Sequence, residues 1–286
     1  MNMNILLTGS GGFIGSNLKK HFAEKFNLFT PRSAELDLCD KKAVKEYFSK
    51  RKIDLVIHCA SVGGARGITD STDTLEKNLL MFNNILSCKN ESVRVITFGS
   101  GAMYGKHRQL HKVCEREIGE IVPKDLYGLS KMEIAKLVEK RNDVLCLNIF
   151  ACYGYDEKDS RFPSYAINCV INHKPIIINQ NVIFDYLWVE DMVKIVEFFV
   201  NNKIHDKIIN ITPSLSISLE EIAKIVNNLS GINNEIIIKN TKLGNEYTGE
   251  NSLLLEHLKD FEFTSYEIGL SKLYNHIRTI GVRNEQ

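Results

Sequence analysis

Short apolar runs alternate with longer amphipathic stretches along the first half of the chain. A short apolar run between turn residues is typical of a strand buried on both faces, and apolar residues at helical spacing are typical of a helix packed on such a sheet. The alternation predicts an α/β fold, a doubly wound parallel sheet with helices on both faces. Strands are expected at residues 5–7, 28–30, 55–58, 93–98 and 144–149, and helices at residues 16–25, 41–50, 75–88 and 129–139.

The pattern changes after residue 150. Helical stretches are expected at residues 164–171 and 189–200, and extended ones at residues 175–178 and 207–211. We expect residues 1–150 to form the parallel-sheet domain, with residues 182–212 returning to it. Residues 151–181 and 213–280 are expected to form a smaller α/β domain.

Two helix starts carry the spacing of a capping box, in which a side chain and a Glu three residues later satisfy each other's backbone N–H groups. One pair is Asp73 with Glu76, and the other is Ser218 with Glu221. The second of these helices is expected to end near Gly231, because glycine readily adopts the left-handed conformation that closes a helix.

A glycine-rich turn follows the first apolar run, with Gly9, Gly12 and Gly15 in the order T-G-x-x-G-x-x-G. Gly9 permits a tight turn, Gly12 lets backbone approach phosphate oxygens, and Gly15 lets the helix pack closely on the strand. The unpaired N–H groups and the dipole of the first helical turn would then face an anion. The motif predicts a seat for the pyrophosphate of a dinucleotide, with a purely structural turn as the alternative.

The residues after the second predicted strand bear on which dinucleotide binds. Sites for NAD usually place Asp or Glu there, to accept a hydrogen bond from the ribose 2′-hydroxyl. Here no carboxylate occurs before Glu35, and Arg32 is placed to meet a 2′-phosphate. We therefore expect NADP(H), with a solvated Arg32 as the alternative. Asp37 and Leu38 are expected beside the adenine, although Asp37 can equally cap a turn.

Composition and charge exclude several other classes of protein. The 286 residues carry a formal net charge of +1, which gives no electrostatic basis for binding nucleic acid or an anionic membrane surface. No apolar run is long enough to span a bilayer, and no secretory leader is evident. The seven cysteines are scattered and odd in number, which indicates free thiols. We expect a cytoplasmic protein with neither nucleic-acid nor membrane partners.

Three residues suggest catalysis. Tyr127 is the only tyrosine with a lysine four residues later, Lys131. On a helix the two side chains share a face, and a nearby ammonium stabilises a phenolate, which suits a general acid. A surface Tyr–Lys pair explains the spacing equally well. Ser100 follows strand 93–98, and ligands of open parallel sheets bind at the carboxyl ends of strands. Its hydroxyl can polarise a substrate carbonyl or only cap the next turn.

These residues fall within a set of motifs spread over nearly the whole chain. The motifs are TGSGGFIG at residues 8–15, HCAS at 58–61, FGSGAMYG at 98–105, YGLSK at 127–131, IFACYG at 149–154 and FDYLWVEDM at 184–192. Together they resemble the extended short-chain dehydrogenase/reductases that act on nucleotide sugars, the NAD-dependent epimerase/dehydratase family. The runs RSAELDLCDKKAVKEYF and HCASVGG are most similar to its branch of GDP-fucose synthase and other 4-keto sugar reductases, which use NADPH.

The resemblance implies a Rossmann fold, a homodimer built on helices 75–88 and 129–139, and a binding site shared by cofactor and substrate. The catalytic residues are expected to be Ser100, Tyr127 and Lys131. The cofactor contacts are expected at Gly9, Gly12, Phe13, Ile14, Gly15, Arg32, Asp37, Leu38, Ala60, Tyr127 and Lys131. The substrate contacts are expected at Val62, Ser100, Gly101, Ala102, Tyr127 and Arg161.

Departures from the family's motifs narrow the chemistry. Gly101 and Ala102 stand where dehydratases of the family carry Asp and Glu, and neither can transfer a proton. Ala102 also stands where GDP-fucose synthase has the cysteine used in epimerisation. The resemblance therefore implies reduction without dehydration or epimerisation.

Two residues that often hold the sugar-nucleotide pyrophosphate are replaced, one by Ala151 and the other by Phe184. Arg66, Arg161 and Lys174 are candidate replacements, and each can also be an ordinary solvated side chain.

The activity expected from these motifs is NADPH-dependent reduction at C4 of a 4-keto deoxy sugar linked to a nucleoside diphosphate, for an unusual sugar of a surface polysaccharide. In this reaction Ser100 polarises the carbonyl, Tyr127 protonates O4, and Lys131 supports Tyr127 and holds the nicotinamide ribose. One alternative is a nucleotide-sugar 4-epimerase that keeps its nicotinamide cofactor bound. The other is a Rossmann protein that senses NADP without catalysis.

A basic segment, KHRQLHKVCER, brings His107, His111 and Cys114 close together. Zinc sites need further well-placed ligands, so no metal is expected. We expect this segment to form a flexible loop over the substrate.

Overall fold

The computed structural model describes residues 3–65 and 67–284, the last five of these as backbone only. Strands are β1 (Asn4–Thr8), β2 (Asn27–Phe29), β3 (Leu55–His58), β4 (Arg94–Ser100), β5 (Leu110–Val113), β6 (Val144–Ile149), β7 (Ala151–Tyr153), β8 (Ile176–Gln180), β9 (Ile183–Phe184), β10 (Tyr186–Trp188), β11 (Ile208–Asn210), β12 (Ile217–Ser218), β13 (Ile236–Asn240) and β14 (Tyr247–Gly249). Helices are α1 (Phe13–Phe22), α2 (Lys41–Ser49), α3 (Thr74–Cys88), α4 (Leu126–Glu139), α5 (Phe162–Ile171), α6 (Val189–Asn201), α7 (Leu219–Ser230), α8 (Ser252–His257) and α9 (Tyr266–Asn284), with short 3₁₀ turns η1 (Gly101–Tyr104) and η2 (Glu115–Glu117).

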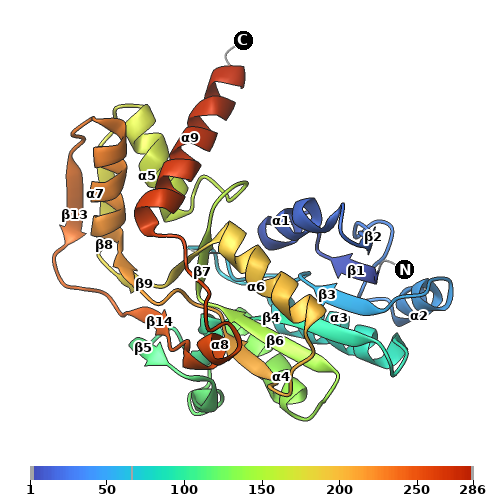
Figure 1. Ribbon diagram of the computed structural model, residues 1–286. Coiled ribbons are helices and arrows are strands. Elements are labelled where there is room, and N and C mark those ends of the chain that lie inside the picture. Colours follow the sequence, from blue (N-terminus) through green and yellow to red (C-terminus); the bar gives the residue numbers. More distant parts are fainter. Residues whose placement is uncertain (1–2, 66, 285–286) are drawn as a thin grey trace.

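A parallel sheet of six strands, in the order β11-β6-β4-β3-β1-β2, forms the centre of the larger part of the fold, with helices on both faces (Figure 1). Successive side chains of its strands point to opposite faces, so each face carries its own core. Leu6 packs with residues of α2, α3 and α4, whereas Ile5 and Leu7 pack with residues of α1 and α6. The expected α/β fold, a doubly wound parallel sheet, is confirmed.

The chain returns to this sheet late. The strands β9 and β10 lead into α6, and β11 then pairs in parallel with β6, the pairing joining Ile209 to Leu147. Strand β11 therefore lies at one edge of the sheet, although it follows β6 by more than fifty residues of chain.

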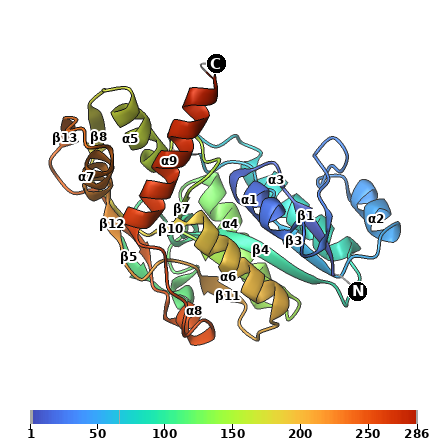
Figure 2. The ribbon, with the colours of Figure 1, turned by 45° about the horizontal axis from the view of Figure 1, so that its top comes forward.

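The remaining elements gather at the carboxyl-end side of the large sheet around a third core, in which Trp188 is 1% exposed. Helices α5, α7 and α9 pack together beside the parallel pair of β8 and β13 (Figure 2). A four-stranded sheet in the order β12-β9-β14-β5 lies between this group and the large sheet.

Capping distinguishes two helix starts that look alike in sequence. Ser218 and Glu221 form the expected capping box at α7, and Gly231 closes that helix with a φ of 69°. The prediction of a capping box at Asp73 is wrong. Its carboxylate makes no cap to α3 and instead bonds to the Ser71 hydroxyl and the Lys77 ammonium.

The basic segment that we expected to be a flexible loop contains a strand. Strand β5 pairs in parallel with β14, and the Leu110 N–H donates to the Glu246 carbonyl at 2.9 Å. His111 pairs with the Glu246 carboxylate at 2.9 Å. Within residues 3–65 and 67–284, no three His, Cys, Asp or Glu side chains gather as metal ligands.

No helix in the described ranges is long and apolar enough to cross a membrane. All seven cysteines lie in those ranges, and none is paired with another.

A buried carboxyl near the start of α5 makes one pH-dependent prediction. Glu157 is 9% exposed; its Oε1 accepts from the Ser164 N–H and hydroxyl, and its Oε2 has no partner among the described residues. Burial raises its pKa from 4.5 to about 7. Since the folded state holds this proton more tightly, the stabilisation is full below pH 4.5 and is lost as the pH rises through 7.

We therefore expect Glu157→Gln to gain stability relative to wild type by about 1.4 kcal/mol per pH unit between pH 4.5 and 7. The free energy of unfolding from urea titrations at several pH values measures this. Glu91→Gln, on an exposed turn, is the control and should run parallel to wild type. A Glu157→Gln curve that also runs parallel would contradict the prediction.

Candidate active site

The glycine turn between β1 and α1 has the geometry that the sequence predicts. Gly9 has a φ of +67°, and a methyl group there would lie 2.5 Å from the Ala60 nitrogen. A methyl group at Gly15 would overlap the Gly9 carbonyl oxygen. Gly12 caps α1 from an extended conformation and accepts from the Ser16 N–H at 2.8 Å. Helix α1 begins at Phe13, three residues before its predicted start. The prediction was late because no Ser, Thr or Asp stands at the cap position.

This turn fits a dinucleotide pyrophosphate. Its glycines bring backbone close to backbone and leave no side chain over the helix N-terminus, where Gly11 has no atom within 4 Å of an added methyl group. Phe13 and Ile14 form the first turn of α1, and Ile14 also lines the large cavity described below. The Gly12 N–H donates to the Gly9 carbonyl oxygen at 3.0 Å, which leaves the N–H groups of the first turn of α1 to face an anion.

The segment after β2 holds the three residues that were expected near the adenosine. Arg32 is exposed, and its N–H donates to a Glu35 carboxylate oxygen at 2.7 Å. Asp37 Oδ1 accepts from the Cys39 N–H at 2.8 Å, which is the turn-capping alternative. Leu38 is 7% exposed and belongs to the core. Arg32 and Asp37 are both exposed, and Arg32 is the one with a positive charge.

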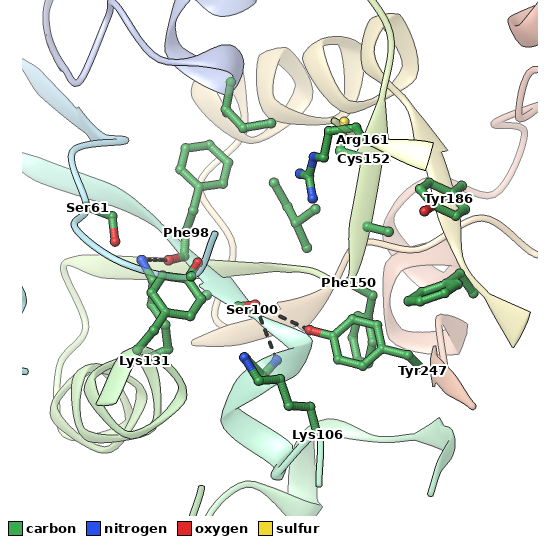
Figure 3. A pocket seen from close by; sticks show the side chains of 18 of the residues that line it. Ser61, Phe98, Ser100, Lys106, Lys131, Phe150, Cys152, Arg161, Tyr186 and Tyr247 are labelled. Atoms are coloured by element: carbon green, nitrogen blue, oxygen red, sulfur yellow. Dashed lines mark hydrogen bonds between the residues drawn. The ribbon is translucent and has the colours of Figure 1, made fainter. Parts of the chain in front are cut away.

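Ser100 ends β4 and starts the 3₁₀ turn η1. Its Oγ accepts from the Ala102 N–H at 3.2 Å, so it does cap this turn. The hydroxyl also faces the cavity, because Ser100 lines it (Figure 3). The capping interpretation is therefore confirmed, and the role in polarising a substrate carbonyl stays a prediction.

Tyr127 and Lys131 lie on the first two turns of α4, which starts three residues before its predicted start because Asp125 accepts from the Gly128 N–H at 2.8 Å. The Lys131 ammonium is 2.9 Å from the Phe98 carbonyl oxygen, to which it donates, and 5.4 Å from the centre of the Tyr127 ring. Lys131 is 7% exposed. The ammonium is thus held between the end of β4 and the phenol.

Two residues that the sequence analysis missed hold this helix against the loop after β3. Asp70 accepts from the Gly64 N–H at 2.8 Å and from the Tyr127 N–H at 2.9 Å. Asn78 bonds to both backbone groups of Val62 and donates to the Ser130 hydroxyl at 3.0 Å. A plain Asp and Asn carry no motif, so only their contacts identify them.

A buried histidine, His58, ends strand β3. His58 is 4% exposed, and its Nδ1 is 2.8 Å from the Thr8 hydroxyl. Burial, with the Lys131 charge, lowers its pKa to about 3. His58 therefore adds no positive charge beside Lys131.

An open cavity of about 400 Å³ extends from Ile14, in the first turn of α1, to the end of β4 and the start of α4 (Figure 3). Ser100, Tyr127 and Lys131 line one side. The opposite side is aromatic and comes from segments far along the chain: Phe150, Phe184, Tyr186 and Tyr247.

The expected substrate contacts divide into two groups. Ala102 and Arg161 line the cavity with Ser100 and Tyr127, whereas Val62 and Gly101 do not. Arg161 is exposed and brings positive charge to the cavity wall, as does Lys106. Lys174 is not among the lining residues, and Arg66 lies outside the described residues. Of the two candidate replacements that the structure describes, Arg161 lines the cavity and Lys174 does not.

A model of the NAD dependent epimerase/dehydratase family matches residues 5–212, and the chain belongs to this family. The recognition made from the motifs is therefore confirmed.

Three known proteins show what the chain is similar to. GDP-L-colitose synthase of Yersinia pseudotuberculosis is 28% identical over 230 residues, which cover 70% of this chain and 73% of that one. GDP-6-deoxy-D-talose 4-dehydrogenase of Aggregatibacter actinomycetemcomitans is 25% identical over 291 residues, covering 95% and 97%. A solved GDP-mannoheptose C4 reductase from Campylobacter jejuni with NADP bound is 20% identical, covers 97% and 98%, and has a TM-score of 0.84, which shows the shared fold.

Proposed function

We propose that this protein reduces, with NADPH, the C4 carbonyl of a 4-keto deoxy sugar linked to a nucleoside diphosphate. The observation that carries the proposal is that Ser100, Tyr127 and Lys131 line one cavity, which reaches Ile14 at the glycine turn. The relatives named above bear names of enzymes of GDP-linked sugars, and GDP is the nucleotide that we propose. The product would serve as an unusual sugar of a surface polysaccharide.

Each of the three residues has a distinct part in the proposed reaction. NADPH supplies the hydride when it is bound. The Ser100 hydroxyl donates a hydrogen bond to the carbonyl oxygen and stabilises the negative charge that develops there. Tyr127 gives its phenolic proton to that oxygen, and the Lys131 ammonium, 5.4 Å from the Tyr127 ring centre, stabilises the resulting phenolate.

Gly101 and Ala102 fit a reductase. Neither has a group that transfers a proton, so these two positions supply no acid–base pair for eliminating water. Arg161 and Lys106 are exposed basic residues of the cavity wall, and we propose Arg161 as a contact for the substrate's diphosphate.

An NADPH-oxidation assay with GDP-, dTDP-, CDP- and UDP-linked 4-keto-6-deoxy sugars tests the proposed function, with NMR of the product. We expect one NADPH consumed per sugar reduced. Turnover without net NADPH consumption would support the 4-epimerase instead. NADPH binding with no activity on any of these sugars would support the cofactor-sensing protein.

We propose NADP(H) as the cofactor on the strength of Arg32, whose guanidinium is exposed beyond β2. A guanidinium can hold two oxygens of a 2′-phosphate at once. We expect Arg32→Ala to raise the KM for NADPH about tenfold, since a charge-assisted hydrogen bond contributes about 1.5–3 kcal/mol. The KM for NADH, measured on the same variant, is the internal control and should change little. Wild-type preference for NADH, or an unchanged KM for NADPH, would show that the assignment is wrong.

The proposal also covers the roles of the two domains, the oligomeric state and the location in the cell. Residues 1–150 with residues 182–212 would bind the cofactor, and residues 151–181 with residues 213–280 would bind the substrate. A homodimer would form through α3 and α4, in the cytoplasm. Sedimentation equilibrium tests the dimer, and a monomer at micromolar concentration would contradict it.

A further inference from the structure

A second tyrosine reaches the proposed catalytic serine from the C-terminal part of the chain. Tyr247 starts β14, and its hydroxyl oxygen is 3.4 Å from Ser100 Oγ (Figure 3). It belongs to none of the motifs in the sequence. Its ring lies between two others of the cavity wall, with centroids 5.5 Å from Phe150 and 5.8 Å from Phe184.

Buried hydrogen bonds hold β14 at the two residues that follow Tyr247. The Gly249 N–H donates to Asp185, a carboxylate with no exposed surface, at 2.8 Å. The Thr248 hydroxyl accepts from the Lys112 N–H at 2.9 Å and is also fully buried. The backbone at Tyr247 is therefore fixed, and with it the place of the phenol.

The phenol also occupies space that a side chain at position 101 would need. A methyl group at Gly101 would lie 2.7 Å from the Tyr247 hydroxyl oxygen and 2.5 Å from Phe150 Cδ1. The residue after Ser100 is thus glycine because Tyr247 and Phe150 are packed against it. The space beside the Ser100 hydroxyl that a side chain at position 101 would fill is taken by the Tyr247 phenol of β14.

We propose that Tyr247 is a positioning residue, whose hydroxyl donates to Ser100 Oγ and so directs the Ser100 proton into the cavity. A serine hydroxyl can accept two hydrogen bonds and donate one. The Ala102 N–H already donates to Oγ at 3.2 Å. With Tyr247 donating as well, both acceptor positions are used, and the remaining O–H points to the substrate. The inference rests on the proposed role of Ser100 in carbonyl reduction.

Two features of the contact suit this role. Burial raises the pKa of the Tyr247 phenol above its ordinary value, so the group stays protonated and remains a donor over the working pH range. The 3.4 Å separation exceeds the usual distance of about 2.7–2.8 Å between hydroxyl oxygens. Catalytic hydrogen bonds are commonly long without substrate and shorten when it binds.

A double-mutant cycle between Tyr247→Phe and Ser100→Ala tests the proposal. Tyr247→Phe keeps the ring between Phe150 and Phe184 and removes only the hydroxyl. We expect it to lower kcat about tenfold, with the KM values for sugar and NADPH unchanged. In the Ser100→Ala background the same change should alter kcat less than about twofold, because the tyrosine acts through the serine. Tyr165→Phe is the matched control, since its hydroxyl accepts from the Ile177 N–H at 3.1 Å and Tyr165 does not line the cavity.

The outcomes separate this inference from the proposed function. An impaired Ser100→Ala with an unaffected Tyr247→Phe overturns the inference alone, as does a tenfold loss in both backgrounds, which would mean that Tyr247 acts independently of Ser100. A fully active Ser100→Ala overturns the proposed role of Ser100. A crystal structure with NADP⁺ tests the contact without substrate: we expect the two oxygens within hydrogen-bond distance, and a separation above about 4 Å excludes the contact.

Discussion

Replacing Tyr127 with phenylalanine is expected to lower kcat about a thousandfold while the affinity for NADPH changes less than about threefold. Proton transfer by a placed side chain contributes about 10²–10⁴ to a rate, and phenylalanine removes that proton while keeping the ring. The ring has little freedom to move, because the Tyr127 N–H is held by Asp70 and the ring edge packs on Gly64. The loss should therefore be chemical rather than structural. Steady-state NADPH oxidation and a fluorescence titration of NADPH measure the two quantities.

Tyr47→Phe provides the control for this experiment. Tyr47 lies on α2, where its ring packs under the Arg51 guanidinium at 3.7 Å, and it does not line the cavity. Its variant should keep wild-type kcat. A Tyr127→Phe enzyme with full activity would end the proposed mechanism, because no other group is assigned the proton.

Adding one methyl group at Gly15 is expected to give the largest loss of cofactor binding. In Gly15→Ala the new carbon would overlap the Gly9 carbonyl oxygen, a backbone atom of the turn itself. Overpacking of this kind costs about 1–3 kcal/mol, and here the strain falls on the pyrophosphate seat, so the affinity for NADPH should drop about 10- to 100-fold.

Gly11→Ala is the control for folding of the same turn, since no protein atom lies within 4 Å of its added methyl group. Fluorescence titration gives the dissociation constant for NADPH, and thermal unfolding shows whether each variant is folded. Gly11→Ala should melt within about 2 °C of wild type, whereas Gly15→Ala should melt lower. Wild-type NADPH affinity in Gly15→Ala would refute the assignment of this turn to the cofactor.

Local patterns sufficed for the elements of the large sheet. Strands β3 and β6 occupy the predicted residues, because a buried strand between two covered faces must be apolar throughout. The starts of α1 and α4 were missed by three residues each, because Gly12 and Asp125 cap them without a full capping box. Of the two helix starts with the spacing of a capping box, Ser218 forms one, whereas at Asp73 the carboxylate bonds to Ser71 and Lys77 instead.

The sequence predicts only those contacts of the site that join residues close together along the chain. Tyr127 and Lys131 belong to one helix, so their spacing encodes their contact. Ser100 and Tyr247 lie 147 residues apart, and nothing in either local sequence states that they meet. The sequence predicts a loop where β5 lies, because β5 pairs with β14, a strand distant along the chain.

The order of residues alone determined the family, the doubly wound sheet, the glycine turn and the three residues proposed for catalysis, because each depends on neighbours within a few positions. Tertiary structure decided which distant groups surround them: the Asp70 and Asn78 contacts that hold α4, the aromatic wall, and the phenol beside Ser100. Such contacts arise where separate segments pack together, and packing depends on shape and burial rather than on spacing along the chain.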